Sequence, residues 1–196
     1  FLGNTLAKIA GEKAGIMKEN VPAVIGRVQV ETTKTFATSA RLKNTEIVYA
    51  ELKPHISIES DLTGIYQAEN KKTAYYALQQ LPEELRPDYF EILKGFGNVV
   101  KNTGLLGRWQ TLSESPLTIC DTGHNEDGIK QVLQQIEETE HDNLHMVWGM
   151  VNDKDVAAVM KLLPKKARYY FARPNLPRGL AAEILFEEAK KLGLNA

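Results

Sequence analysis

Apolar residues along the chain follow two patterns, the three-to-four-residue spacing of helices and the short continuous runs of buried strands. The helical spacing predicts helices at 4–17, 31–42, 67–81, 88–98, 128–139, 155–163 and 181–192. The short runs, bounded by turn residues, predict strands at 22–26, 46–49, 117–120, 145–148 and 168–171. Asn4 or Thr5 can cap the first helix, and Asp153 can cap the helix at 155–163.

Strands and helices alternate three times in the second half of the chain. Each connection between successive strands there is a dozen residues or longer, which a crossover between parallel strands requires. The pattern therefore predicts an α/β fold of right-handed βαβ units, with a mainly parallel sheet covered on both faces. Pro82 and Pro87 bracket a short polar connection, so we expect one domain at 1–82 and another at 83–196.

Composition narrows the classes of protein to which the chain can belong. Its 196 residues are 43% hydrophobic and 25% charged, as in an ordinary soluble globular protein. The net charge of −1, with both signs mixed along the chain, argues against sequence-independent nucleic-acid binding, which needs a basic face. No apolar stretch approaches the ~18 residues that span a membrane. The start carries no signal-peptide pattern, so we expect a cytoplasmic protein without nucleic-acid or membrane partners.

Cys120 is the single cysteine, so the chain forms no intramolecular disulfide. It lies in an apolar run, which favours a small buried hydrophobic residue over a reactive thiol. The chain begins at Phe1 without an initiator methionine and ends just after a predicted helix. We therefore expect it to be a piece of a longer protein.

The end of the strand at 117–120 combines an acid and an imidazole. In an open α/β sheet, ligands bind outside the carboxyl ends of the strands. Asp121 leaves this strand, and His124 precedes a helix whose free N–H groups suit phosphate or carboxylate. Asp121 could hold ribose hydroxyls or a metal-bound water, and His124 could stabilise a phosphoryl oxygen or orient a substrate acid. Alternatively, Asp121 and Asn125 only cap the turn and His124 is a surface residue, and the spacing leaves both interpretations open.

At three other positions the sequence also allows either a structural or a ligand-binding role. Gly149 follows a strand, where close approach of two backbones is the favoured explanation. Arg173 and Arg178 follow the next strand and either bind anions or are solvated. Arg108 comes directly after Gly107, so its guanidinium either reaches phosphates in a bidentate way or is exposed on a loop.

Familiar nucleotide-binding signatures are missing, but a series of weaker strings is present. The chain has no G-x-x-x-x-G-K-[ST] phosphate loop, no G-x-G-x-x-G and no metal-spaced Cys/His set. Five strings are LGNTLAKIAGEKAGIMK at 2–18, GIYQAEN at 64–70, GRWQ at 107–110, DTGHN at 121–125 and GMVNDKD at 149–155. In this order they resemble the L-G-x-T-x-x-x-I-A-x-E-K-A-G-I-x-K, G-x-x-Q-x-x-N, G-R-x-(Q/E), D-x-A-H-N-P and G-x-x-x-D-K-D segments of folylpolyglutamate synthases. Many bacterial members of that family also act as dihydrofolate synthases.

The resemblance to this family, which belongs to the Mur ligase superfamily, implies a fold and a reaction. It implies that 83–196 is most of a Rossmann-like, mainly parallel C-terminal glutamate-ligase domain, truncated at its end. Residues 1–82 would be the last part of the ATP-binding central domain. The implied enzyme is a monomer that uses ATP and Mg²⁺ to phosphorylate a folate carboxylate, and L-glutamate then attacks the acyl phosphate. Dihydropteroate is the other implied acceptor of glutamate. Without a phosphate loop, the chain alone is expected to be inactive.

The same resemblance implies roles for five residues. Lys13 matches a lysine that the family can carbamylate, and it would be a metal ligand only in that form; otherwise it is a solvated helix lysine. Asn70 matches a residue near the adenine, and Arg108 matches an arginine that reaches the nucleotide from the C-terminal domain. Asp121 matches an acid near the ribose or phosphates, and His124 a histidine near the γ-phosphate or the incoming glutamate. The expected catalytic residues are Lys13, Asp121 and His124; the expected ATP-binding residues are Asn70, Arg108, Asp121 and His124.

The sequence departs from the family pattern at the DTGHN string. Gly123 stands in place of alanine and Glu126 in place of proline, so a looser turn and an added negative charge are expected there. Two other functions stay open. One is another Mur-type amino-acid ligase, for cyanophycin or a cell-wall precursor, although the string at 12–16 speaks against the cell-wall branch. The other is a non-catalytic Rossmann-like binding module.

Overall fold

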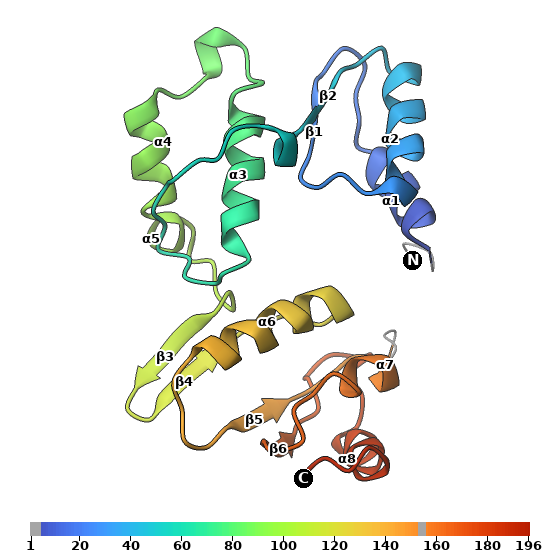
Figure 1. Cartoon of the computed structure of the whole chain (residues 1–196), viewed down its shortest axis with the longest axis vertical. Helices are drawn as coiled ribbons and strands as arrows, with labels where there is room; N and C mark the ends of the chain where they lie inside the picture. Colours follow the sequence, from blue (N-terminus) through green and yellow to red (C-terminus); the bar gives the residue numbers. More distant parts are fainter. Residues whose placement is uncertain (1–4, 153–155) are drawn as a thin grey trace. The chain divides into compact units, whose positions relative to one another are not determined.

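The computed structural model describes residues 5–152 and 156–196, which form two compact units, Phe1–Leu106 and Gly107–Ala196 (Figure 1). The first unit contains α1 (Leu6–Ala14), β1 (Ala23–Ile25), α2 (Val30–Leu42), β2 (Ile47–Tyr49), the 3₁₀ helix η1 (Ala50–Leu52), α3 (Gln67–Leu78), the 3₁₀ helix η2 (Glu83–Leu85), α4 (Tyr89–Phe96) and α5 (Val99–Thr103). The second contains β3 (Gln110–Glu114), β4 (Leu117–Cys120), α6 (Glu126–Glu138), β5 (His145–Trp148), α7 (Val156–Met160), β6 (Arg168–Phe171) and α8 (Ala182–Lys191).

Two helices and a parallel strand pair form the core of the first unit. β1 pairs with β2 in parallel, with Val24 opposite Val48. Small side chains on α1 and α2 let these helices approach each other closely. The buried cluster consists of Ala10, Ala14, Met17, Phe36 and Ala40, with Ala23, Ile25 and Ile47 packed against it.

Side chains of α3 hold the irregular segment that follows β2. Lys72 Nζ donates to the Glu51 carbonyl at 3.0 Å, and Lys71 Nζ donates to the Ile58 carbonyl at 2.6 Å. Tyr76 Oη donates to the Pro54 carbonyl at 2.9 Å. Backbone carbonyls outside regular structure need such donors, so this segment is fixed by one helix rather than by a sheet.

The helix α5 belongs to the first unit because a distant carboxylate caps it. Asp61 Oδ2 accepts hydrogen bonds from the N–H groups of Val100 at 2.9 Å and Lys101 at 3.2 Å. The division between the units therefore falls after Leu106, later than the boundary expected after residue 82.

The second unit combines a hairpin, a parallel strand pair and three helices. β3 and β4 are antiparallel, with Gln110 opposite Cys120 and a register shift further along the hairpin. β5 and β6 are parallel, from His145 opposite Arg168 to Trp148 opposite Phe171. One buried core joins α6, α7, α8 and β6 through Ile129, Met150, Val159, Met160, Leu163, Ala167, Tyr169, Leu185, Ala189 and Leu194.

The predicted α/β class with parallel strands is confirmed, but the sheet differs from the expectation in two details. Within the described ranges the strands pair as three two-stranded sheets, and β3–β4 is antiparallel. Among the described residues of the second unit, helices cover one face of the β5–β6 sheet and leave the other face open. Val147 is 76% exposed on its open face, where the ring of His145 stacks on Tyr170. The covering helices all contribute to the same core.

Most predicted helices and strands are found within a few residues of their expected bounds. β5 and β6 coincide with the predicted strands, and Thr5 caps α1 by accepting a hydrogen bond from the Lys8 N–H at 3.2 Å. β3 and α5 were not predicted. The expected cap at Asp153 lies outside the described residues.

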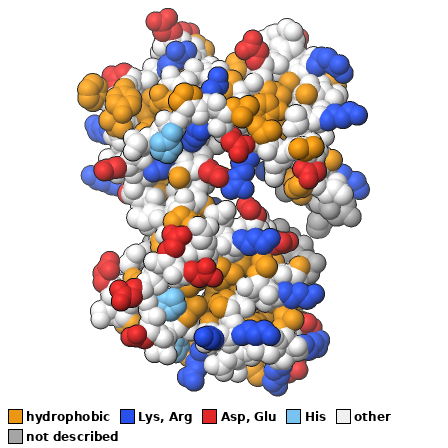
Figure 2. All heavy atoms as spheres, in the orientation of Figure 1, with side chains coloured by type: hydrophobic (Ala, Val, Ile, Leu, Met, Phe, Trp, Pro, Cys, Tyr) orange, Lys and Arg blue, Asp and Glu red, His pale blue; other side chains and the backbone are white. Residues whose placement is uncertain are grey.

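The described residues show neither a membrane-spanning helix nor, on the face drawn in Figure 2, a surface of one charge sign. No helix in the described ranges has both the length and the apolar character needed to cross a bilayer. On the face drawn in Figure 2, lysines and arginines alternate with aspartates and glutamates across the described residues. The mixture on this face agrees with the sequence, in which charges of both signs nearly balance to a net charge of −1.

Removing the centre of the second core should unfold the chain more easily. Leu185 is fully buried on α8, so Leu185→Ala leaves a cavity and should lower the free energy of unfolding by about 2–5 kcal/mol. Its neighbour Ile184 is 50% exposed, and Ile184→Ala serves as the control with a much smaller expected loss. Urea denaturation of both variants measures the difference. Equal losses would contradict the position of Leu185 in the core.

Candidate functional site

The carboxylate of Asp121 joins two loops at the open end of the β3–β4 hairpin. Asp121 Oδ2 accepts a hydrogen bond from the Trp109 N–H at 2.7 Å, and Oδ1 accepts one from the Gly123 N–H at 2.7 Å. The first bond reaches the loop before β3, and the second closes the turn after β4. Hydrogen bonds to an ionised acceptor are roughly twice as strong as neutral ones. The turn-capping role considered for Asp121 is therefore present in the structure.

The loop before β3 has an unusual backbone. Gly107 has φ +69°, and Trp109 has φ +50°, a conformation that is rare for an aromatic residue. The Gln110 side chain accepts from the Gly107 N–H at 3.0 Å, and the Trp109 side chain is 8% exposed. Backbone strain of this kind persists only where the surroundings hold it, and here Asp121 holds the strained residue by its N–H group.

Arg108 is bound to the second loop through Thr122. Arg108 Nη1 donates to Thr122 Oγ1 and also to the Gly107 carbonyl, at 3.2 Å. The Thr122 N–H and hydroxyl each donate to the same Gly107 carbonyl at 3.0 Å. Arg108 and Thr122 are exposed, so these bonds hold the guanidinium in place at the surface of the unit.

His124 lies in the same turn with its ring held from one side. Its Nδ1 is 3.0 Å from the Thr122 carbonyl. A carbonyl only accepts hydrogen bonds, so Nδ1 carries the proton in this bond and Nε2 is the unprotonated nitrogen of the neutral ring. The ring is exposed, which leaves Nε2 able to reach a ligand.

The helix after this turn starts with a cap and two acids. Asn125 Oδ1 accepts from the Gly128 N–H at 2.8 Å, so Asn125 is the N-cap of α6, as one of the two interpretations proposed. Glu126 and Asp127 occupy the first helical turn. Lys130 Nζ lies 2.6 Å from Glu126 Oε1 and offsets one of these charges.

Asn70 lines a cavity in the first unit. The cavity has a volume of about 510 Å³ and lies between β1 and α3, with Val24, Gly26, Asn70 and Thr73 among its lining residues. Asn70 Nδ2 donates to the Oε1 of the buried Gln67 at 3.0 Å. This bond fixes the Asn70 amide and leaves its oxygen available as an acceptor.

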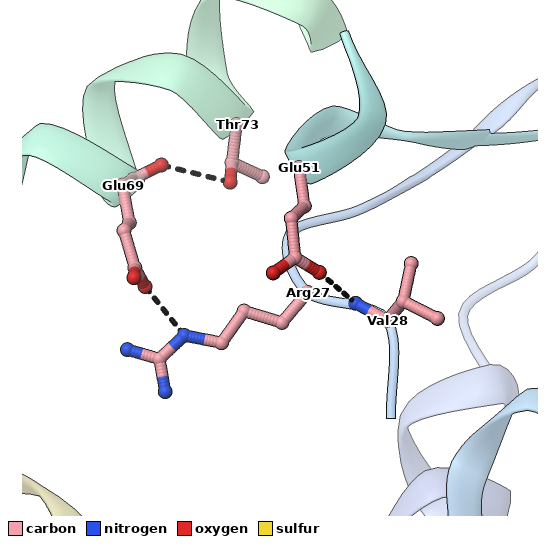
Figure 3. A network of polar contacts seen from close by, with 5 residues as sticks. All are labelled: Arg27, Val28, Glu51, Glu69 and Thr73. Carbon is pink, nitrogen blue, oxygen red and sulfur yellow. Dashed lines mark hydrogen bonds and ion pairs between the residues drawn. The ribbon is translucent and has the colours of Figure 1, made fainter. Parts of the chain in front are cut away.

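A polar network at the carboxyl end of β1 holds the start of α3 (Figure 3). Arg27 Nε donates to Glu69 Oε2 at 2.5 Å, and the Thr73 hydroxyl donates to the Glu69 carbonyl at 2.9 Å. The Val28 N–H donates to Glu51 Oε2 at 2.7 Å. Because the Arg27–Glu69 pair is exposed, it contributes only about 0–1 kcal/mol. Its importance is geometric, since Glu69 directly precedes Asn70.

Lys13 lies in the last turn of α1 and is exposed. An ammonium group there repels a divalent cation, and only a carbamylated side chain would offer oxygen ligands. Among residues 5–152 and 156–196, no group of three or more His, Cys, Asp or Glu side chains is arranged to hold a metal ion. The residues described do not by themselves form a magnesium cage.

The ends of β5 and β6 are joined by backbone contacts. Leu180 N–H donates to the Met150 carbonyl at 2.9 Å, and Asn152 N–H donates to the Arg178 carbonyl at 3.0 Å. A side chain at Gly149 would come within 2.6 Å of the Ala172 carbonyl, which confirms close backbone approach there. Arg173 is exposed, as is the side chain of Arg178.

Shifted pKa values occur away from these loops. Burial raises the pKa of Tyr169, whose hydroxyl donates to the Pro164 carbonyl at 2.7 Å within the second core. The hydrogen bond to Glu188, and then the charge of that carboxylate, raise the pKa of Lys191 on α8. These two groups are structural and lie outside the candidate site.

The structure thus brings three of the five expected site residues together in the second unit. Arg108, Asp121 and His124 lie on two hydrogen-bonded loops. Lys13 and Asn70 lie in the first unit. Sequence analysis assigned no role to Thr122 or Gln67, although both lie inside the quoted strings, at positions that the family pattern leaves variable or unexplained.

Comparison with known proteins identifies the second unit. Residues 107–196 match the family model described as Mur ligase, glutamate ligase domain. The dihydrofolate synthase/folylpolyglutamate synthase of Bacillus subtilis is 25% identical, over 97% of this chain and 49% of its own length. The "Probable dihydrofolate synthetase" of Schizosaccharomyces pombe is 30% identical, over 85% of this chain and 44% of its own length.

Solved structures agree with this result. The structure described as E. coli FolC in complex with DHPP and ADP has a TM-score of 0.78 and 26% identity. The match covers 99% of this chain and 48% of that one. The chain therefore spans about half the length of the relatives compared.

Neutralising the Asp121 carboxylate should weaken the second unit. Asp121→Asn keeps one acceptor oxygen but turns an NH₂ group toward one of the two N–H donors. We expect the free energy of unfolding to fall by about 1–3 kcal/mol, measured by urea denaturation. Asp142→Asn, in an exposed loop of the same unit, is the control. A stability equal to that of the control would show that the two bonds contribute little.

Proposed function

Residues 107–196 belong to the Mur ligase glutamate ligase domain family, and from this premise we propose that the protein carrying this chain is an ATP-dependent glutamate ligase. Its acceptor is a folate, as in a folylpolyglutamate synthase, or dihydropteroate, as in a dihydrofolate synthase. The relatives with these names, which match 85% or more of the chain, support this substrate class. We further propose that the enzyme is a cytoplasmic monomer.

The observation that carries the proposal is the arrangement around Thr122. Arg108 and His124 are 16 residues apart in the chain, and both are bonded to Thr122. A guanidinium and an imidazole held by the same residue suit a phosphoryl group and the amine that replaces it. Charge neutralisation of this kind is the main requirement of phosphoryl transfer.

The proposed reaction has two steps. A carboxylate oxygen of the folate attacks the γ-phosphorus of ATP, and ADP leaves. The amine of L-glutamate then attacks the acyl carbon, the carbon–oxygen bond breaks, and phosphate leaves as the amine loses a proton. Mg²⁺, when bound, supplies further positive charge for the phosphates. Arg108 would bind the phosphates, and His124 would contact the γ-phosphate or receive the proton at Nε2.

The remaining expected residues keep proposed roles. The Asn70 amide would contact the adenine from the cavity between β1 and α3. Lys13 would join the metal site only as a carbamate. Asp121 would act mainly through the two backbone N–H groups it binds, since these bonds engage both carboxylate oxygens.

A reaction assay tests the function. The gene product that contains these residues is mixed with ATP, Mg²⁺, dihydropteroate or tetrahydrofolate, and L-glutamate. We expect ADP and phosphate only when acceptor and glutamate are both present, with one glutamyl residue added per ADP. The 196 residues alone should be inactive, since they contain no phosphate loop. If ADP forms with a cell-wall precursor or a cyanophycin primer and not with folates, the enzyme is a different Mur-type ligase. If no acceptor leads to ADP, the chain belongs to a binding module.

His124 can be tested against a histidine of the same local geometry. His141 Nδ1 lies 2.6 Å from the Thr139 carbonyl two residues earlier, the same arrangement as His124 with Thr122. His124→Ala should lower kcat by on the order of 10²-fold, the cost of losing one contact to developing charge. His141→Ala should leave kcat unchanged. Similar kcat values for the two variants would remove His124 from the reaction.

A further inference from the structure

Thr122 contacts Arg108 and His124, the cation and the imidazole that the proposed function uses in the second unit. Its hydroxyl accepts a hydrogen bond from Arg108 Nη1, and its carbonyl lies 3.0 Å from His124 Nδ1. The hydroxyl also donates to the Gly107 carbonyl at 3.0 Å. One side chain therefore connects the loop that carries the cation with the loop that carries the imidazole.

The direction of these hydrogen bonds is fixed by chemistry. A threonine hydroxyl has one proton to donate and two lone pairs that accept, whereas a guanidinium only donates. The hydroxyl proton is committed to the Gly107 carbonyl, so a lone pair faces Arg108. The same carbonyl, which also accepts from the Thr122 N–H, accepts a further bond from Arg108 Nη1 at 3.2 Å. Two acceptors thus hold the guanidinium, the Thr122 hydroxyl and the Gly107 carbonyl, and a hydrogen bond joins these two groups to each other.

The methyl group of Thr122 fixes the same contact sterically. A Cβ atom added at Gly107 would lie 2.6 Å from Thr122 Cγ2, so only glycine fits against this methyl group. The Gly107 backbone is also in the left-handed region, with φ +69°. Hydroxyl and methyl therefore have separable roles, one toward Arg108 and one toward Gly107.

We propose that Thr122 is a positioning residue that holds the Arg108 guanidinium in its binding geometry before the nucleotide arrives. The inference rests on the proposed function, in which Arg108 binds the phosphates of ATP. A long arginine side chain loses rotamer freedom when it binds a ligand, and a residue that restricts it beforehand lowers that loss.

Substitutions at Thr122 separate the hydroxyl from the methyl group. Thr122→Val keeps the shape and removes the acceptor, so the KM for ATP and the Kd for ADP should rise about five- to tenfold, the effect of one hydrogen bond, with kcat changed less. Thr122→Ser keeps the acceptor and should retain most of the affinity. Thr111→Val, on the exposed side of β3, is the matched control and should behave as the wild type.

A double-mutant cycle decides whether Thr122 acts through Arg108. In an Arg108→Ala background, Thr122→Val should have no further effect on the Kd for ADP. A full effect in that background would overturn the inference, and so would a Thr122→Ser variant as weak as Thr122→Val. If Thr122→Val does not fold, judged by its melting temperature, Thr122→Ala takes its place in the cycle.

A readout without activity separates this inference from the proposed function. Arg108 guanidinium ¹⁵N–¹H signals, assigned by their loss in Arg108→Ala, report how freely the side chain rotates. We expect restricted rotation in the wild type and fast rotation in Thr122→Val, whether or not the protein forms ADP. Absence of ligase activity with this NMR difference present would reject the function alone, and equal rotation in both proteins would reject the positioning role.

Discussion

The Asp121 carboxylate holds the candidate site together because it binds N–H groups on both loops. Its two oxygens accept from Trp109 and Gly123, each at 2.7 Å. The first bond holds a tryptophan at φ +50°, directly after Arg108, and Arg108 is bonded to Thr122. Without a strong acceptor at this point, the strained loop would relax. The acid therefore has a structural role, because it joins the two loops.

The sequence predicted those helices and strands whose residues carry a clear apolar pattern of their own, and it missed those that depend on distant contacts. β5 and β6 were predicted with their observed bounds, because their apolar runs end at turn residues. β3 was missed because both of its faces are largely exposed, so its sequence QTLSE carries no apolar alternation. α5 was missed because its N–H groups are capped by Asp61, about 40 residues earlier, a partner that local spacing cannot reveal. The same contact explains why the first unit extends beyond Pro82.

The candidate site shows a similar limit. Spacing identified Asp121, His124 and Asn125 as residues at a strand end, and the structure shows the expected caps by Asp121 and Asn125. The catalytic role of Asp121 and His124 stays a prediction. Thr122 could not be found from spacing, because its importance depends on a loop 12 to 15 residues earlier in the chain and on the close packing of Gly107. A residue between two motif positions becomes visible only when the loops are folded against each other.

Electrostatics at the start of α6 explains why a fixed Arg108 matters in this chain in particular. A helix N-terminus attracts anions, but Glu126 and Asp127 oppose that attraction in the first turn. Lys130 pairs with Glu126 at 2.6 Å and offsets one charge only, at an exposed position where ion pairs are weak. The strings at 107–110 and 121–125 contain no lysine and no second arginine, so Arg108 is their one permanent cation. Under the proposed function, Arg108 is therefore the cation of these two strings that would bind the phosphates, and phosphate affinity should depend on how firmly Thr122 holds that guanidinium.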